Sequence, residues 1–195
     1  RQLLAEQFVF HSIALDVRQH SADGTIKSRY KLHDGNFIET VLIPVVEDRR
    51  ATACVSSQVG CSLTCSFCAT GRMGRIRNLT AAEIYDQAYD TNKLSQEALG
   101  YPLTNIVYMG MGEPLLNYAP VMESIRMITS PEGMAWSPRR ITVSTAGIAK
   151  MIRRLGDEQV KFNLALSLHA ADDLKRNEIM PINESNNLQA LMEAL

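Results

Sequence analysis

Apolar and polar residues alternate along the first quarter of the chain as they do in antiparallel sheets. Segments 26–32 (IKSRYKL), 36–46 (NFIETVLIPVV) and 50–57 (RATACVSS) are rich in β-branched and aromatic residues, which favour strands. Between the first two lies Asp34-Gly35-Asn36, which is typical of a hairpin turn. The pattern predicts an antiparallel meander, and residues 1–10 (RQLLAEQFVF) indicate the end of a helix before it.

From residue 80 onward the pattern changes to apolar strands that alternate with helices. Thr80-Ala81-Ala82-Glu83 has the spacing of a capping box and begins a helix that we expect to run to about Leu99. Nearly unbroken apolar strands separated by helices are typical of a parallel sheet that is covered on both faces. The further strands expected are 104–112, 139–147 and 161–170, and the further helices are near 119–128, 148–156, 172–180 and 187–195.

Parallel sheets of this α/β kind bind ligands at the carboxyl ends of their strands. The residues at those ends are 110–114, 144–147 and 167–169. We therefore expect the functional residues there and in a cysteine-rich loop that follows the meander. The chain has 195 residues, of which 46% are hydrophobic, and this is enough to bury a core without disulfide bonds.

The net charge and the hydropathy of the chain say less about its function than these patterns do. The formal net charge is −1, from 20 basic and 21 acidic residues, and by itself it indicates no polyanionic partner. No apolar run approaches the roughly 20 residues of a transmembrane helix, so we expect a cytoplasmic protein with no membrane partner. Because the chain begins at Arg1 and stops at Leu195 inside a segment of helical pattern, we expect a fragment of a longer protein.

All four cysteines, Cys54, Cys61, Cys65 and Cys68, lie within fifteen residues. Thiols this close could close only very small loops, which argues against a disulfide framework and for metal or redox chemistry. The last three form C-x3-C-x2-C, and three thiolates leave one iron of a cubane cluster without a protein ligand. The alternative is a tetrahedral structural zinc completed by Cys54 or a histidine, although three ligands in a single loop fit that pattern poorly.

The C-x3-C-x2-C motif resembles the signature of the radical S-adenosylmethionine (SAM) enzymes. The wider set "CVSSQVGCSLTCSFCATG", "RNLT", "GMGEPLLN", "RRITVSTAG", "LALSLHA" and "MPIN" resembles the RlmN/Cfr family of RNA adenine methyltransferases, from about Glu39 to the last residue. The resemblance implies an α/β fold, a partial (βα) barrel of the radical SAM type, truncated here, with an N-terminal antiparallel β extension. It places the linker and extension at residues 1–48 and the radical SAM core at 49–195.

The resemblance also implies two cofactors, one four-iron four-sulfur cluster and SAM. It assigns Cys61, Cys65 and Cys68 as the cluster ligands, and the open iron as the site that binds the amino and carboxylate groups of SAM. Without the resemblance, "GMGEP" would be an ordinary βα turn, and a histidine at a strand end would be a structural residue. With it, the implied SAM contacts are Gly112, Glu113, Ser144, Ser167, Leu168 and His169.

Two further residues match catalytic positions of the family. Cys54 matches the resolving cysteine, whose thiolate attacks a methyl-carrier cysteine and releases the product as a disulfide forms. Glu39 matches the position proposed as proton acceptor. On the residues alone, Cys54 could be a buried apolar cysteine and Glu39 a solvated strand residue. No cysteine follows Cys68 to match the carrier, so we do not expect this chain alone to methylate RNA.

The implied reaction is methylation of an aromatic carbon of adenosine in 23S rRNA, and also in tRNA. RlmN enzymes act at carbon 2 and Cfr enzymes at carbon 8, and Pro114 favours carbon 2. The resemblance also implies a monomer with an electron donor such as flavodoxin. The alternatives are a carbon-8 enzyme, another radical SAM enzyme, or a non-catalytic zinc-binding RNA module.

Several arginines are candidate RNA contacts, because their guanidinium groups can bind phosphates. For the two pairs at 139–140 and 153–154, exposure on the solvated face of a helix is at least as good an explanation. The candidate arginines are Arg72, Arg75 and Arg77 after the cysteines, and the pairs Arg139-Arg140 and Arg153-Arg154.

Overall fold

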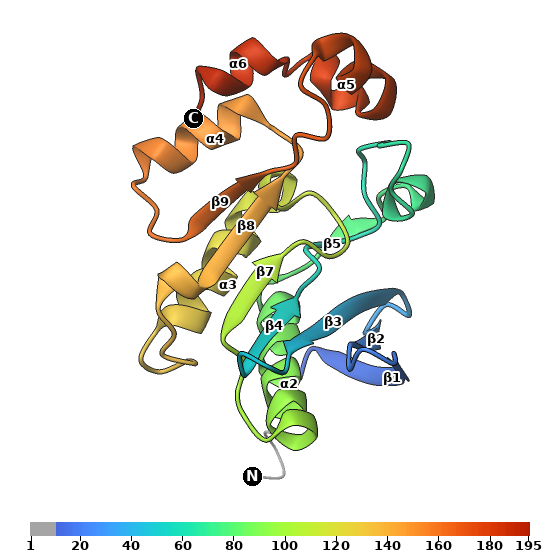
Figure 1. Cartoon of the computed structure of the whole chain (residues 1–195), viewed down its shortest axis with the longest axis vertical. Coiled ribbons are helices and arrows are strands. Elements are labelled where there is room, and N and C mark those ends of the chain that lie inside the picture. Colours follow the sequence, from blue (N-terminus) through green and yellow to red (C-terminus); the bar gives the residue numbers. More distant parts are fainter. Residues whose placement is uncertain (1–10) are drawn as a thin grey trace.

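The structure, a computed structural model, describes residues 11–195, and the helix end predicted within residues 1–10 lies outside them. A seven-stranded sheet in the order β1-β2-β3-β4-β7-β8-β9 runs through the molecule (Figure 1). Its strands are β1 (Ile13–His20), β2 (Ile26–Leu32), β3 (Phe37–Val45), β4 (Arg50–Cys54), β7 (Asn105–Tyr108), β8 (Ile141–Thr145) and β9 (Asn163–Leu166). The α-helices are α2 (Ala81–Leu99), α3 (Tyr118–Thr129), α4 (Ala149–Asp157), α5 (Asp173–Ile179) and α6 (Leu188–Met192).

The first four strands pair antiparallel, which confirms the predicted meander. In the hairpin between β2 and β3, the Leu32 N–H donates to the carbonyl oxygen of Asn36 at 2.8 Å. Gly35 takes a φ of 82° there, in the left-handed region that glycine adopts without strain. Strand β1 (IALDVRQH) was not predicted, although its apolar residues alternate with others.

The last three strands of this seven-stranded sheet, β7, β8 and β9, are parallel, which confirms the α/β class. β4 belongs to both the antiparallel part and the parallel part of the sheet, because it pairs antiparallel with β3 and parallel with β7. β7, β8 and β9 then follow in parallel. One sheet thus joins the β extension to the βα units, and the domain boundary predicted at residue 49, in the turn before β4, stays a prediction.

Helix α2 begins where the sequence predicts. The side chain of Thr80 accepts the N–H of Glu83 at 3.2 Å, and the carboxylate of Glu83 accepts the N–H of Thr80 at 2.9 Å. The helix ends at Gly100, whose φ of 77° is a left-handed C-cap. The capping box and the predicted length are both confirmed.

Helices cover one face of the sheet more completely than the other. Ile38, Thr40 and Leu42 of β3 are buried on the side of α2, and Thr40 donates to the side chain of Gln87 at 2.8 Å. The residues between them are partly exposed, and β7 and β8 show the same alternation. The expectation of two covered faces is therefore wrong for residues 11–195, since even apolar residues of the second face, such as Ile43 and Val107, stay partly exposed.

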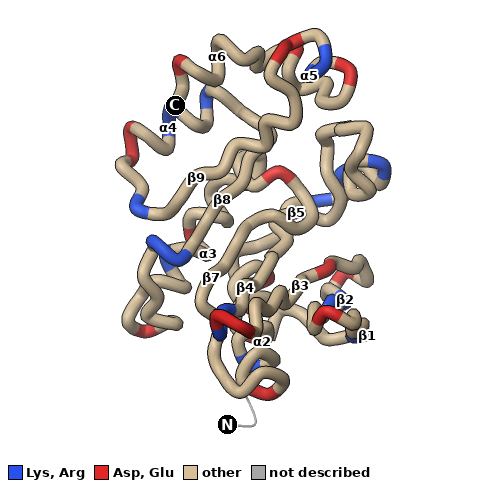
Figure 2. Tube along the Cα trace, viewed as in Figure 1, with Lys and Arg blue, Asp and Glu red and all other residues tan. Residues whose placement is uncertain are grey.

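Charged residues of both signs are distributed over the described elements (Figure 2). Within residues 11–195, no helix has the combination of length and apolar character needed to cross a membrane.

Candidate active site

Residues 60–76 form the cysteine loop between two short strands, β5 (Gln58–Val59) and β6 (Arg77–Asn78), which pair antiparallel and close its base. The two ends of the loop cross at Gly60, where a Cβ atom would lie 1.8 Å from the carbonyl oxygen of Gly74. Only glycine fits this crossing. Farther along, the Cys68 N–H donates to the carbonyl oxygen of Cys65 at 3.0 Å and forms a turn that orients the last two cysteines.

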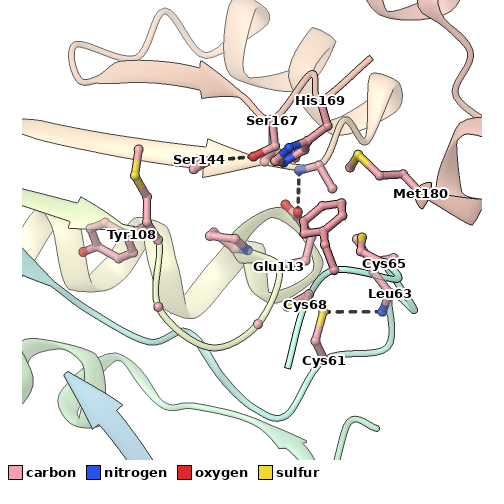
Figure 3. Close-up of a pocket in the computed structure, with 17 residues that line it drawn as sticks. Cys61, Leu63, Cys65, Cys68, Tyr108, Glu113, Ser144, Ser167, His169 and Met180 are labelled. Carbon is pink, nitrogen blue, oxygen red and sulfur yellow. Dashed lines mark hydrogen bonds between the residues drawn. The ribbon is translucent and has the colours of Figure 1, made fainter. Parts of the chain in front are cut away.

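The cysteine loop faces the carboxyl ends of β7, β8 and β9 across a pocket of about 280 Å³ (Figure 3). Segments far apart in the sequence meet here, as expected for the ends of parallel strands. Phe67, Tyr108 and Met180 also line the pocket and were not predicted. Of the predicted site residues, those that line it are Cys61, Cys65, Cys68, Gly112, Glu113, Ser144, Ser167 and His169.

The donor set of the cysteine loop fits an iron–sulfur cluster. Cys61 and Cys65 are buried, and burial raises the pKa of both thiols. The Leu63 N–H donates to Sγ of Cys61 at 3.4 Å, a kind of contact that tunes cluster-bound sulfur. Each cysteine of a cubane binds a different iron, so the ligands need not converge on one point. Among residues 11–195, no three cysteine, histidine or acidic side chains converge to hold one metal ion.

Glu113 joins the ends of two parallel strands. Its carboxylate accepts the N–H of Ala146 at 2.7 Å and the N–H of Leu115 at 3.0 Å, while its own N–H donates to Oε1 of Gln58 at 2.9 Å. Burial raises the pKa of Glu113, and the two N–H donors oppose that shift. Because the Glu113 side chain is buried and bound to these two N–H groups, the more accessible backbone around Gly112, with a φ of 99°, is the part that we expect to meet a ligand.

The ends of β8 and β9 meet at the other side of the pocket. Oγ of Ser144 and Oγ of Ser167 are 3.2 Å apart and share a hydrogen bond. The ring of His169 lies 4.3 Å, between ring centroids, from the ring of Phe67, which belongs to the cysteine loop. His169 also has a φ of 58°, which is uncommon for a residue other than glycine. The contact with Phe67 links β9 to the cysteine loop.

A family model described as "Radical SAM superfamily" matches residues 55–195, which contain the cysteine loop and all three strand ends. The chain belongs to the radical SAM superfamily. The predicted radical SAM fold is confirmed by a crystal structure of a radical SAM methyltransferase from Sphaerobacter thermophilus. That structure has a TM-score of 0.94 and 43% identity, over 99% of this chain and 56% of the other.

Relatives within the radical SAM superfamily confirm the predicted resemblance to the RlmN/Cfr family. The "Probable dual-specificity RNA methyltransferase RlmN" of Cytophaga hutchinsonii is 60% identical over 195 residues, which are 100% of this chain and 53% of that protein. The "Dual-specificity RNA methyltransferase RlmN" of Nautilia profundicola is 41% identical over 98% of this chain and 56% of its own length. The chain thus spans about half the length of the curated relatives it matches.

Cys54 and Glu39 lie outside the lining of the radical SAM pocket, on the partly covered face of the sheet. Cys54 of β4 is opposite Val41 of β3, and Glu39 is the preceding residue of β3 on the same face. Burial raises the pKa of the Cys54 thiol to about 11. Glu39 forms an ion pair with Lys27 at 3.0 Å, and its side chain is 43% exposed. The structure makes the two residues neighbours, and their catalytic roles stay predictions.

Arg176 of α5 is a buried residue behind the radical SAM pocket that was not predicted. Its guanidinium donates to the carbonyl oxygens of Ala146 at 2.6 Å and Leu168 at 3.1 Å, just beyond β8 and β9. Leu168 itself is exposed and lies outside the pocket lining. In the sequence, Arg176 lies in a charged helical segment, and nothing there distinguishes it from the exposed Lys175.

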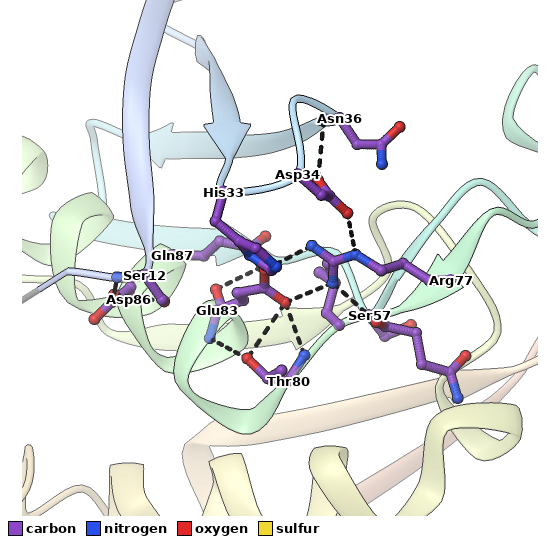
Figure 4. Close-up of polar contacts among 12 residues, drawn as sticks. Ser12, His33, Asp34, Asn36, Ser57, Arg77, Thr80, Glu83, Asp86 and Gln87 are labelled. Carbon is purple, nitrogen blue, oxygen red and sulfur yellow. Dashed lines mark hydrogen bonds and ion pairs between the residues drawn. The ribbon is translucent and has the colours of Figure 1, made fainter. Parts of the chain in front are cut away.

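An ion pair ties the base of the cysteine loop to α2 (Figure 4). Arg77 of β6 donates to the two carboxylate oxygens of Glu83 at 2.9 and 2.8 Å, and it also pairs with Asp34 of the β2–β3 turn. Burial acts to raise the pKa of Glu83, but hydrogen bonds from Arg77 and Thr80 outweigh it and hold the pKa below its ordinary value. Arg77 is thus engaged within the fold, which argues against its predicted role as an RNA contact.

We expect Arg77→Met to lower the free energy of unfolding by about 2–3 kcal/mol at pH 7. The carboxylate of Glu83, only 1% exposed, then loses its guanidinium partner and keeps only the imidazole of His33, at 3.6 Å. The folded-state pKa of Glu83 is lowered, so the pair stabilises the fold above the ordinary pKa of about 4.3. That contribution is lost as the pH falls through the lowered value. Urea unfolding between pH 7 and pH 3 measures both effects.

The matched control is Arg126→Met, which removes an exposed ion pair with Glu123 on α3. We expect it to change the free energy of unfolding by less than about 0.5 kcal/mol. Equal losses in the two variants, or a loss in Arg77→Met that does not depend on pH, would contradict the prediction.

Proposed function

We propose that this chain forms part of a radical SAM RNA methyltransferase that methylates carbon 2 of an adenosine in 23S rRNA and in tRNA. The observation that carries the proposal is one pocket in which a three-cysteine loop faces the ends of β7, β8 and β9. The names of the RlmN relatives support RNA as the substrate. Because the chain spans about half of those relatives, the activity is proposed for the whole protein.

In this proposal the residues of the pocket divide between two ligands. Cys61, Cys65 and Cys68 hold a four-iron four-sulfur cluster, and the backbone at Gly112 and Glu113 receives the amino group of SAM. When bound, the cluster supplies the electron that cleaves SAM to a 5′-deoxyadenosyl radical. The remaining SAM contacts are Ser144, Ser167, Leu168 and His169.

Radical chemistry suits this substrate because an aromatic carbon of adenine is too weak a nucleophile to take a methyl group from a sulfonium directly. A carrier cysteine of the whole enzyme would receive the methyl group first. Glu39 would accept the proton that the ring releases as it regains aromaticity. The thiolate of Cys54 would then attack the carrier sulfur. Both residues lie partly exposed on the same face of the sheet, with Cys54 opposite Val41 and Glu39 two residues before Val41 on β3.

The proposed macromolecular partners are the RNA and an electron donor such as flavodoxin. Arg72 and Arg75 of the cysteine loop are exposed and are the arginines nearest the cluster ligands in sequence. Cations at this position could bind RNA phosphates. The monomeric state and the cytoplasmic location stay predictions.

Anaerobic purification with analysis of iron, sulfide and zinc tests the proposal. We expect iron with acid-labile sulfide, and 5′-deoxyadenosine and methionine as products when SAM and a chemical reductant are added. Stoichiometric zinc without sulfide, and no cleavage of SAM, would instead support a zinc-binding RNA module.

The position of methylation needs a separate measurement. Pro114 favours carbon 2, and it lines the pocket directly after Glu113. Ribosomal RNA from cells that contain or lack the whole enzyme, digested to nucleosides and analysed by mass spectrometry with standards, distinguishes the products. We expect 2-methyladenosine to depend on the enzyme, and 8-methyladenosine would place it with the Cfr enzymes.

A further inference from the structure

Arg176 is the largest fully buried side chain of the described residues, with an exposed fraction of 0%. A guanidinium keeps its charge in proteins, so a buried one must be hydrogen-bonded throughout. No carboxylate of residues 11–195 lies within ion-pair distance of it. Its partners are neutral oxygens instead: the carbonyls of Ala146, Ser167, Leu168 and Asn186, and the side chain of Asn183.

Three of these carbonyls lie at the radical SAM pocket: Ala146 and Ser167 line it, and Leu168 stands between Ser167 and His169, which also lines it. Ala146 follows β8, and Ser167 and Leu168 follow β9, at distances of 2.6, 3.4 and 3.1 Å from the guanidinium. A single side chain thus binds the backbone of two loops that arrive from separate strands. A planar fork of N–H donors can do this, whereas the ammonium of a lysine presents a compact point charge.

One of these contacts fixes an uncommon turn. The carbonyl oxygen of Leu168 also accepts the N–H of Ala170 at 2.7 Å, so that His169 is the central residue of a γ-turn with a φ of 58°. γ-Turns with a positive φ are rare and strained, and the surrounding structure must hold them. The bond from Arg176 to Leu168 lies next to the strained residue. It holds the backbone from which the His169 ring extends into the pocket.

The same helix contacts the cysteine loop on the opposite side of the pocket. The Ser66 N–H donates to the carbonyl oxygen of Ile179, the last residue of α5, at 2.9 Å. Met180, the next residue, lines the pocket. Helix α5 therefore bonds to the cysteine loop at one end, and to the ends of β8 and β9 through Arg176.

We propose that Arg176 is a positioning residue that sets the ends of β8 and β9 against the cysteine loop, and so gives the pocket the shape that binds SAM. The inference rests on the proposed function for the identity of the ligand. The contacts on which it is based involve only residues of this chain. Arg176 contacts loop backbone rather than the ligand, and it acts through Ala146, Ser167 and Leu168.

The test compares Arg176→Gln and Arg176→Lys with the unchanged protein. Lys175→Gln is the matched control, because Lys175 is on the same helix with a side chain 78% exposed. Iron and sulfide content should stay unchanged in all variants, since the cluster ligands are intact. Residues that orient a site through its ligands typically change affinity or activity by 10- to 100-fold, and we expect SAM to bind about 10- to 100-fold more weakly in both Arg176 variants. Lysine should not restore binding.

Hydrogen–deuterium exchange gives a readout that needs neither cofactor. In the Arg176 variants we expect faster exchange at the amides of Ala170 and Ser66, with no change in α2. A purely structural role would accelerate exchange throughout the core instead. Three results would overturn the proposal: faster exchange throughout the core, loss of folding in both variants, or SAM binding restored by Arg176→Lys.

The same experiment separates this inference from the proposed function. If the unchanged protein, with its cluster assembled, does not bind SAM, the proposed function fails. The exchange pattern at Ala170 and Ser66 then still decides whether Arg176 shapes the pocket.

Discussion

Replacing Cys65 by alanine is expected to abolish reductive cleavage of SAM. Cys65 is buried in the cysteine loop and lines the pocket together with Cys61 and Cys68. The two thiolates that remain would hold a cubane cluster poorly, and the loss of the third would perturb the open iron proposed to bind SAM. The measurements are iron and sulfide content, the electron paramagnetic resonance spectrum of the reduced protein, and the yield of 5′-deoxyadenosine. We expect the same loss from alanine at Cys61 or Cys68.

Cys54→Ala is the control for this series. Cys54 lies in the same stretch of sequence but at the end of β4 and outside the pocket lining, so its loss should leave both iron content and SAM cleavage intact. Full cleavage by Cys65→Ala would remove that residue from the ligand set. Loss of iron in Cys54→Ala would instead make Cys54 a fourth ligand of the cluster.

The same Cys54→Ala change is expected to stop turnover at a later step in the whole enzyme, for which the proposed function requires a carrier cysteine. A methylene bridge between the carrier sulfur and adenine breaks when a thiolate attacks that sulfur: a disulfide forms, the carbon–sulfur bond breaks, and the carbon keeps the electron pair and takes up a proton to become the methyl group. Without the Cys54 thiolate, protein covalently joined to RNA should accumulate. A denaturing gel with labelled RNA shows the adduct as a shifted band.

A control on the same strand and a pH series sharpen this test. Thr52→Ala changes another residue on the same face of β4 and should form no adduct. Burial raises the pKa of Cys54 to about 11, so the thiolate fraction, and with it the rate of release by the unmodified enzyme, should rise with pH above neutrality. Release of methylated RNA by Cys54→Ala at the unmodified rate would exclude Cys54 from the mechanism.

Local patterns in the sequence predicted most of the elements. The capping box at Thr80, the Gly35 turn and the apolar runs of the parallel strands each depend on residues close together in the chain, and the structure confirms them. The strand predicted at 104–112 is shorter, ending at Tyr108, because the residues after it turn into the pocket. Strand β1 was missed because its apolar run is short and its pairing with β2 is a tertiary contact.

The sequence by itself determined which thiols lie together in one loop, and it limited the site to metal or redox chemistry. Three cysteines at C-x3-C-x2-C spacing share one loop, and a loop can present several thiols together whatever surrounds it. The rule that ligands bind at the carboxyl ends of parallel strands likewise indicated Gly112, Ser144 and Ser167. These inferences need only local spacing and the direction of each strand.

Only the tertiary structure decided which polar residues serve the fold. In the sequence, Arg77 and Arg176 look like ordinary exposed cations. In the structure, Arg77 pairs with Glu83 and Asp34, and Arg176 binds the backbone beyond β8 and β9. Periodicity reports which side of an element a residue occupies, but not which distant segment covers that side. A buried charge is stable only through partners that packing brings to it, and those partners lie up to 43 residues away along the chain.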